Sequence, residues 1–170
     1  IFGVEAYITN DPDGMVKEER TKDNYHLVMI AENETGYRNL LDLVSRAQLE
    51  NFYHKPRISK HNLTPEKVEG IIATSACLGN EVNRVGGWTP ETGYINLDAM
   101  KTAASFYKSV FGSNYFLEIQ DNDDSAQQQR TYNEHVKQLG IELGISNVIT
   151  SDAHYTTVQS SELHSMLMAM

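Results

Sequence analysis

The sequence predicts an α/β fold with a mainly parallel sheet, and three observations support this. Short apolar runs typical of strands alternate along the chain with stretches whose apolar residues recur every three or four positions, as in helices. Turn-forming residues separate these runs. Polar residues suited to chemistry follow several of the strands directly. Such alternation favours either an open doubly wound sheet or a closed βα barrel, and the pattern does not separate the two.

The first half of the chain is expected to hold three strands and two helices. Residues 1–8 and 25–31 are short runs of β-prone side chains, and turn-forming residues at 10–14 end the first run. Residues 34–50 have the apolar periodicity of an amphipathic helix. Residues 52–57 are expected to form a loop, because Pro56 lacks an amide donor. A short helix capped by Thr64 then leads into a strand at residues 70–74.

The second half continues the alternation. After a glycine-rich loop at residues 86–90, the periodicity of residues 97–111 predicts a helix that Gly112 ends. A strand at 115–119 and a polar turn at 121–125 follow, and the turn caps a long helix with Tyr132, Val136 and Leu139 on its buried stripe. A strand at 147–150 and a helix at 161–170 complete the expected order.

Length and charge narrow the class of protein. The chain has 170 residues, the size of one domain, and residues 1–170 are treated as a single unit. A net charge of −9 argues against a surface built mainly to hold nucleic acid, although carboxylates around metal ions would also lower the charge of a nucleic-acid enzyme. No apolar run approaches the roughly 18 residues that a membrane span needs, so a cytoplasmic location without membrane partners is expected.

Four polar residues lie at or just past the ends of predicted strands. Cys77 follows the strand at 70–74, Glu118 lies near the end of the strand at 115–119, and Asp152 and His154 follow the strand at 147–150. Functional groups of parallel sheets gather at these carboxyl ends. An extended Asp-x-His segment projects both side chains to one side, where they could reach a metal ion. The alternatives are a solvated loop for the Asp-x-His pair and a buried apolar filler for Cys77.

Glu5, His26 and Arg57 are further candidates. Glu5 shares a strand face with Tyr7 and points either into a barrel or to solvent. A buried carboxylate there would be costly unless it is paired or bound to metal. His26 opens its strand, at the wrong end for a carboxyl-edge site, and the residues alone favour a core histidine bonded to a carbonyl. Arg57 follows Pro56 in a basic segment that either contacts phosphate or is simply exposed.

Six short motifs, taken in order, resemble the PHP (polymerase and histidinol phosphatase) domain of bacterial DNA polymerase III alpha subunits. They are GVEAY at 3–7, YHLV at 25–28, NETGYRNL at 33–40, FYHKPR at 52–57, SACL at 75–78 and DAHY at 152–155. Each motif is weak by itself. Their common order and plausible intervals, over nearly the whole chain, make the resemblance specific.

The resemblance implies a distorted (β/α)7-type barrel that holds up to three metal ions. Carried over by motif, it implies metal binding by Glu5, His26, Cys77, Asp152 and His154. It further implies catalytic roles for Asp152 and His154 and phosphate binding by Arg57, and it leaves Glu118 near the site without a defined role. It also reverses the interpretations of His26 and Cys77 given above. A mixed set of N, O and S ligands fits Zn²⁺ or Mn²⁺ better than Mg²⁺.

The chain departs from the family pattern at its front. The family opens with a His-x-His strand, then an Asp and a further His, before the strand that carries Gly-x-Glu-x-Tyr. None of these four residues is present, so the chain is expected to be a partial domain that lacks the amino-terminal strands. Fewer bound ions and a barrel open on one side are expected consequences.

The function implied by the resemblance is DNA replication, as one domain of a DNA-directed DNA polymerase whose nucleotidyl transfer resides elsewhere. The complete domain would hydrolyse phosphodiesters with metal ions, as a 3′ to 5′ proofreading exonuclease acting on a DNA 3′ end. An alternative is a non-catalytic platform that contacts the remainder of the polymerase chain and a separate proofreading exonuclease subunit. A phosphoesterase for a small phosphate such as histidinol phosphate is disfavoured, because NETGY and FYHKPR resemble the polymerase branch.

Overall fold

The computed structural model describes residues 1–120 and 127–170, and the expected polar turn at 121–125 lies outside them. The strands are β1 (Gly3–Thr9), β2 (Tyr25–Ala31), β3 (Phe52–Tyr53), β4 (Lys55–Ser59), β5 (Ile71–Thr74), β6 (Tyr115–Gln120) and β7 (Ser146–Thr150). The α-helices are α1 (Glu34–Leu49), α2 (Glu81–Gly86), α3 (Leu97–Phe111), α4 (Gln127–Leu143) and α5 (Ser161–Met168). Short 3-10 turns are η1 (Lys17–Glu19), η2 (Lys60–Asn62), η3 (Gly112–Asn114) and η4 (Val158–Ser160).

The strands form one mixed sheet in the order β3-β4-β1-β2-β5-β6-β7. The α/β class is confirmed, and the pairs β1–β4, β5–β6 and β6–β7 are parallel as expected. The expected mainly parallel arrangement is wrong for β2, which runs antiparallel to both β1 and β5. The physical reason lies in the connection between β1 and β2, which contains only a single 3-10 turn and no α-helix to carry the chain back for a parallel pairing.

Three local predictions need correction. Residues 52–57 form the β3–β4 hairpin rather than a loop, and Pro56 is tolerated because the parallel ladder of β4 with β1 begins only at Arg57. The short helix expected from Pro65 is a series of hydrogen-bonded turns, in which the amides of Lys67 and Val68 both donate to the Thr64 carbonyl. The helix α2 was not predicted, because its six residues are too few to show a periodic pattern.

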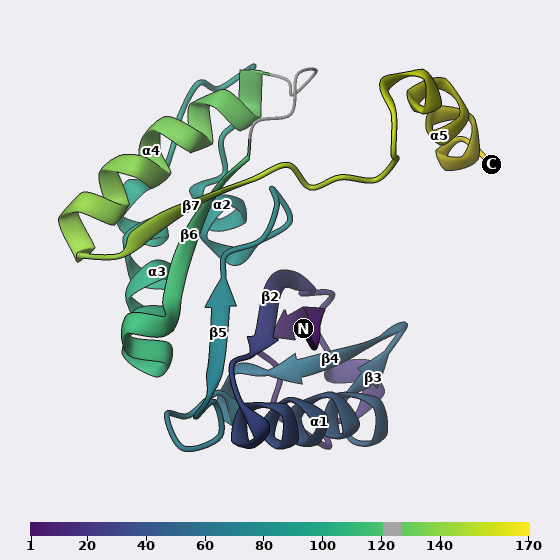
Figure 1. Cartoon of the computed structure of the whole chain (residues 1–170), viewed down its shortest axis with the longest axis vertical. Coiled ribbons are helices and arrows are strands. Elements are labelled where there is room, and N and C mark those ends of the chain that lie inside the picture. Colours follow the sequence, from purple (N-terminus) through teal and green to yellow (C-terminus); the bar gives the residue numbers. More distant parts are fainter. Residues whose placement is uncertain (121–126) are drawn as a thin grey trace.

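The helices bury the apolar stripes that the sequence predicts. Helix α1 packs on β2, β4 and β5 through a buried stripe that includes Leu40 and Leu43, and it lies across the bottom of Figure 1. Helices α3 and α4 cover β6, and α4 also contacts β7, with Tyr132 and Val136 in the core. These stripes remove large apolar areas from water at about 25 cal/mol per Å², which is the main force that holds the helices on the sheet.

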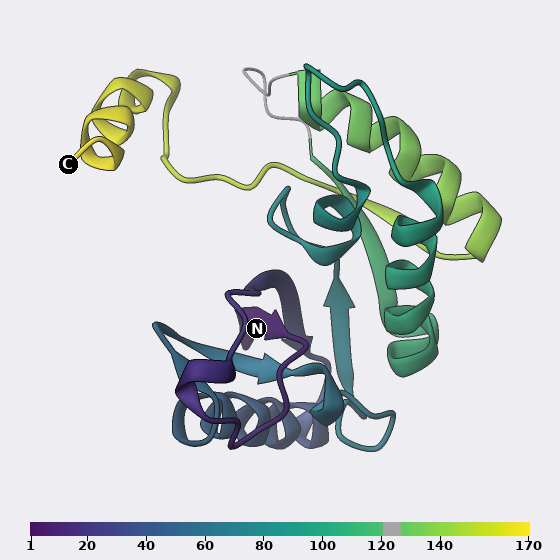
Figure 2. The same ribbon diagram turned by 180° about the vertical axis from the view of Figure 1, so that it is seen from behind.

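Helix α5 stands apart from the rest of the molecule. An extended segment leaves the end of β7 and carries α5 away from the sheet, as both views show (Figure 1, Figure 2). Its large apolar side chains Leu163, Met166 and Leu167 are exposed. In the described ranges, none of the helices combines the length and apolar character needed to cross a bilayer.

Candidate metal centre

The register of the sheet gathers polar side chains on one face. Tyr7 of β1 lies opposite His26 of β2, and Glu5 lies opposite Val28. Residues paired across strands share a face, so Glu5, Tyr7 and His26 project to the same side. Ala6 alternates with them and is buried on the other side, as the predicted alternation requires.

The direction of β2 brings His26 to the correct edge of the sheet. Because β2 is antiparallel, its first residues lie beside the last residues of β1, where Tyr7 pairs with His26. The carboxyl end of β5 lies on the other side of β2, where Thr74 pairs with Val28. From sequence, the position of His26 at the start of its strand argued against a site at the carboxyl edge. In the antiparallel strand β2, the same position places His26 at this edge.

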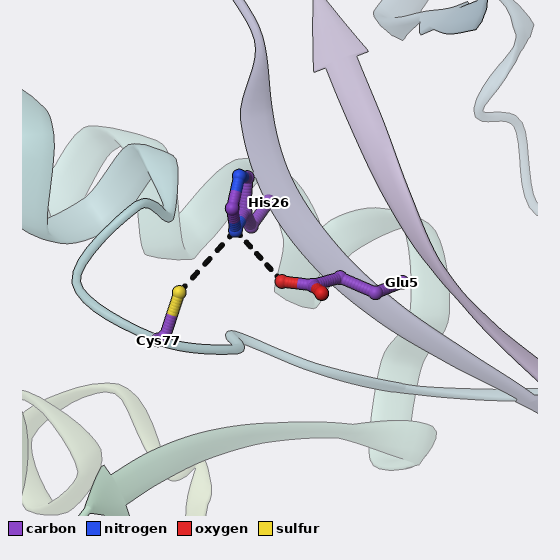
Figure 3. Close-up of side chains that lie close together, drawn as sticks. All are labelled: Glu5, His26 and Cys77. Carbon is purple, nitrogen blue, oxygen red and sulfur yellow. Dashed lines mark hydrogen bonds and ion pairs between the residues drawn. The ribbon is translucent and has the colours of Figure 1, made fainter. Parts of the chain in front are cut away.

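Glu5, His26 and Cys77 meet at this edge. The His26 Nδ1 atom lies 2.7 Å from Glu5 Oε1 and 3.3 Å from Cys77 Sγ. One ligand atom from each residue lies within 4.8 Å of the others, and Figure 3 shows the imidazole between the thiol and the carboxylate. His26 and Cys77 are half-buried, whereas Glu5 is more exposed. The structure thus brings together one nitrogen, one oxygen and one sulfur donor.

The loop that carries Cys77 is fixed against β2. Ala76 adopts a left-handed conformation with φ 59°, which is costly for a residue with a Cβ and turns the chain sharply after β5. The His26 amide then donates to the Gly79 carbonyl at 3.1 Å. A side chain at Gly79 would lie 3.0 Å from His26 Nδ1, so glycine permits this close approach. These contacts hold the thiol beside the imidazole.

A hollow of about 200 Å³ opens next to the cluster. Its walls include Glu5, Cys77, Glu118 and Asp152. Lysine and arginine are absent from its lining in the described part of the chain. Three carboxylates and a thiol therefore face one small space without a cation, which is the environment that a bound cation would neutralise.

Glu118 ties the strand ends around this hollow together. Its buried carboxylate accepts hydrogen bonds from Thr74 Oγ1 at 2.6 Å and from Thr150 Oγ1 at 3.2 Å. Its amide donates to Ser75 Oγ at 2.8 Å. These partners come from the ends of β5 and β7 and from the residue after β5, so Glu118 spans the strands that lead to Cys77 and Asp152.

The surroundings of Cys77 favour the neutral thiol in the absence of a cation. Burial raises the pKa of the thiol, and the nearby Asp152 and Glu5 carboxylates raise it further. A divalent ion would reverse this balance, because thiolate and carboxylate both bind cations. The donor set of Glu5, His26 and Cys77, with Asp152 across the hollow, fits a divalent metal ion of the borderline class.

The other predicted site residues are placed differently. Asp152 lines the hollow and has a left-handed φ of 46°, whereas His154 is exposed on the extended segment after β7, with its ring 5.6 Å from that of His164. Arg57 is buried and donates to the Asp11 carboxylate at 2.8 Å and to the carbonyl oxygens of Thr21 and Asp23. Phosphate binding by Arg57 stays a prediction, because these contacts leave only Nε without a partner in the described residues.

Sequence reasoning missed several residues that shape the site. Thr74 and Thr150 hold Glu118, Gln120 lines the hollow, and Tyr7 packs edge-on against His26 with ring centroids 5.1 Å apart. A usable signal did exist, since Thr74, Gln120 and Thr150 are the last residues of their strands. Polar residues at that position point to the functional edge of a sheet.

Comparison with known proteins identifies the family. The PHP domain model matches residues 1–122. The chain is 38% identical to DNA polymerase III subunit alpha of Helicobacter pylori, 36% identical to that of Deinococcus radiodurans and 34% identical to that of Thermus aquaticus. These matches cover 100% of the chain but only 14%, 12% and 13% of the respective relatives, so the chain spans a small part of each. The chain belongs to the PHP domain family.

Proposed function

We propose that the chain serves DNA replication as the PHP domain of a DNA polymerase III alpha subunit and that its metal centre hydrolyses phosphodiesters in the complete domain. The observation that carries the metal centre is the convergence of Glu5, His26 and Cys77 within 4.8 Å. The polymerase assignment is supported by relatives of that name that match the whole chain. In that setting the reaction is the removal of nucleotides from a DNA 3′ end, and the protein acts in the cytoplasm.

The ligand set supports Zn²⁺ or Mn²⁺ as the bound ion. A thiolate is a poor ligand for Mg²⁺, whereas imidazole, carboxylate and thiolate together suit the softer ions. Glu5, His26 and Cys77 would hold one ion, and Asp152 across the hollow is suited to a second ion or to the same one. His154 completes the proposed ligand set from the segment that follows β7.

The residues of the chain have distinct proposed roles in hydrolysis. A divalent ion, when bound, supplies an acidified water and stabilises charge on the leaving oxygen. Glu5 and His26 are proposed ligands of that ion, and Glu5 Oε1 and His26 Nδ1 lie 2.7 Å apart. Asp152 and His154 are the proposed catalytic pair, and Asp152 already faces the hollow in which a phosphodiester would be attacked. Arg57 is the proposed phosphate-binding residue on the neighbouring strand β4.

Metal content tests the proposal directly. The purified chain is incubated with Zn²⁺ or Mn²⁺, separated from free ions and analysed by inductively coupled plasma mass spectrometry. We expect stoichiometric metal in the parent chain and a clear loss in Cys77→Ser and Glu5→Gln, because each removes a donor from the cluster. His61→Gln is the matched control, since His61 is exposed and is not part of the cluster. Equal metal content in all four proteins would overturn the proposed centre.

The non-catalytic platform is a second candidate with its own support. Within residues 1–120 and 127–170, only three of the five predicted ligands converge. His154 lies on the segment that leads to α5, with its ring beside that of His164 in the helix. A platform would use its surfaces to contact the polymerase core and a proofreading exonuclease subunit. A parent chain that retains no metal, with the same thermal stability in chelator and in Zn²⁺, would favour this candidate over hydrolysis.

A further inference from the structure

A basic surface surrounds the turn of the β3–β4 hairpin. We call this surface the hairpin surface, and it consists of two hollows that share Tyr53 and His54. The first, of about 190 Å³, is completed by Lys22, Asn24, Lys55 and Arg57. The second, of about 390 Å³, is completed by Met15, Lys17, Arg20 and Phe52. The two hollows therefore meet at the turn of the hairpin, where His54 is exposed.

The charge of the hairpin surface opposes that of the chain. Five of the 14 lysines and arginines line the two hollows, although the net charge of the chain is −9. Both linings lack Asp and Glu in the described residues. Acidic residues do flank them in sequence: Glu18 and Glu19 are exposed on η1, and Asp23, between Lys22 and Asn24, accepts a hydrogen bond from Asn10. Lys22 and Lys55 belong to no salt bridge among the residues that the structure describes. Their charges are available to an anion.

Arg57 forms a rigid floor for the first hollow. Its guanidinium is almost completely buried and is held by the Asp11 carboxylate and two backbone carbonyls. Arg57 therefore lines the hollow in a fixed position.

The turn itself presents aromatic rings beside the cations. His54 is exposed with a left-handed φ of 61°, an outlier for a residue with a Cβ. The Tyr53 ring lies 4.4 Å from the His54 ring and 5.2 Å from the Arg57 guanidinium, measured between centres. Phe52 is half-exposed and lines the second hollow. Cations along a groove with interleaved aromatic rings are the features that bind single-stranded nucleic acids.

One aromatic ring separates the hairpin surface from the metal cluster. Lys55 Nζ donates to the Tyr7 hydroxyl at 2.8 Å and lies 4.2 Å from the centre of the Tyr7 ring. The same ring also packs against His26, with centroids 5.1 Å apart. A nucleic-acid strand with a phosphate bound at Lys55 would therefore pass close to the Glu5, His26 and Cys77 cluster.

We propose that the hairpin surface binds single-stranded nucleic acid. Lys22 and Lys55 contact successive backbone phosphates above the Arg57 floor, and exposed Phe52 and His54 stack against bases. Only one part of this inference rests on the proposed function, namely that the bound nucleic-acid strand runs toward the metal centre. Binding itself needs no metal, so the two proposals fail independently of each other.

The test is fluorescence anisotropy of a labelled hexathymidylate with the 170-residue chain in excess chelator, at about 50 mM and about 200 mM salt. Each phosphate contact on a single strand contributes about 0.7 to the slope of log affinity against log salt. Lys22→Gln/Lys55→Gln is therefore expected to lower the slope by about 1.4, so that the parent loses about sevenfold more affinity than the variant over this range. Phe52→Ala is expected to weaken binding about fivefold and to leave the slope unchanged.

Two controls keep the result specific. Lys101→Gln/Lys137→Gln removes the same charge from lysines paired with Glu142 and Glu134, far from the turn in sequence. Substitution of Lys55 also removes its hydrogen bond to the Tyr7 hydroxyl. Lys22→Gln is therefore measured alone as well, because Lys22 is exposed and its replacement leaves that hydrogen bond in place. Absent binding by the parent, or an equal change of slope in the control pair, would overturn the proposal. Inorganic phosphate that displaces the oligonucleotide at equal phosphate concentration would identify a free-anion site and overturn the strand assignment.

Discussion

Replacing Asp11 by Asn tests the buried ion pair that closes the connection between β1 and β2. Asp11 Oδ2 lies 2.8 Å from Arg57 Nη2, and the two side chains are only 3% and 2% exposed. The Asp11 carboxylate also accepts hydrogen bonds from the Thr21 amide at 3.0 Å and the Thr21 hydroxyl at 2.8 Å. Asn has the same shape as Asp, so Asp11→Asn removes the charge and leaves the space filled.

The expected loss of stability is large for a single atom change. Breaking a buried pair by neutralising one partner costs about 3–5 kcal/mol, because the other charge stays buried. The Asn oxygen can still accept from Thr21, so we expect about 3 kcal/mol, or a melting temperature lower by about 6–12 °C for a chain of this size. Asp42→Asn is the matched control. It breaks an exposed ion pair with Arg46, and such a pair contributes about 0.3–0.5 kcal/mol to the free energy of unfolding.

The effect of Asp11→Asn depends on pH in a defined direction. Burial raises the pKa of Asp11, but the hydrogen bonds from Thr21 and the charge of Arg57 outweigh it and hold the pKa below its ordinary value. A depressed folded-state pKa gives stability that is complete above the unfolded pKa of about 3.9 and is lost as pH falls through the folded value. The difference between parent and variant should therefore be full at neutral pH and shrink in acid.

Urea unfolding followed by circular dichroism measures this difference, at neutral pH and at about pH 3. Equal unfolding free energies for Asp11→Asn and Asp42→Asn at neutral pH would refute the importance of the pair. A difference between Asp11→Asn and the parent that stays constant between the two pH values would refute its electrostatic origin.

Three further predictions concern buried polar groups. Glu118→Gln is expected to lower the free energy of unfolding in urea by about 1–3 kcal/mol, because an amide nitrogen would then face a threonine hydroxyl donor. Glu32→Gln is the control, since Glu32 is exposed. An equal or smaller loss in Glu118→Gln than in this control would contradict the prediction. Lys60→Met leaves the buried Glu81 carboxylate without its cation and is expected to lower the free energy of unfolding by about 3 kcal/mol. The double variant Lys60→Met/Glu81→Gln should recover part of this loss. Full stability of the single variant would argue against a contribution from the pair. Burial, and then Glu81, raise the pKa of Tyr107 well above 10, so stability should fall as pH rises beyond about 10, where only the unfolded chain loses this proton. Tyr107→Phe should flatten the fall in melting temperature, and parallel curves would disprove the assignment.

The elements that sequence predicted best are those with long periodic patterns. Helices α1, α3 and α4 lie where the apolar spacing predicted them, because many residues of each helix repeat the spacing that forms its buried stripe. The β3–β4 hairpin and the direction of β2 were not predicted. Both depend on which strands pair, and pairing is decided by contacts between residues distant in sequence, which a local pattern does not record.

The candidate site shows the same division. The chemical types of Glu5, His26 and Cys77 were evident from sequence, and the structure brings these three together. Their meeting depends on register, which the sequence left open when it allowed Glu5 to face either a barrel interior or solvent. The residues that connect the strand ends, such as Thr74 and Thr150, were missed because threonine is not a typical metal ligand, although their place at the ends of strands was a usable signal.

The direction of β2 links the stability of the fold to the metal centre. A seven-residue strand is about 20 Å long, so a parallel β2 would place His26 at the opposite edge of the sheet, beyond the reach of Glu5 and Cys77. The connection that reverses the chain ends at the residue before β2, and Arg57 binds the carbonyls of Thr21 and Asp23 within it. The buried arginine therefore fixes the point at which β2 begins, and with it the position of the imidazole. Weakening of the Arg57 contacts should loosen His26 before it unfolds the sheet, since α1 holds β2 and β4 independently.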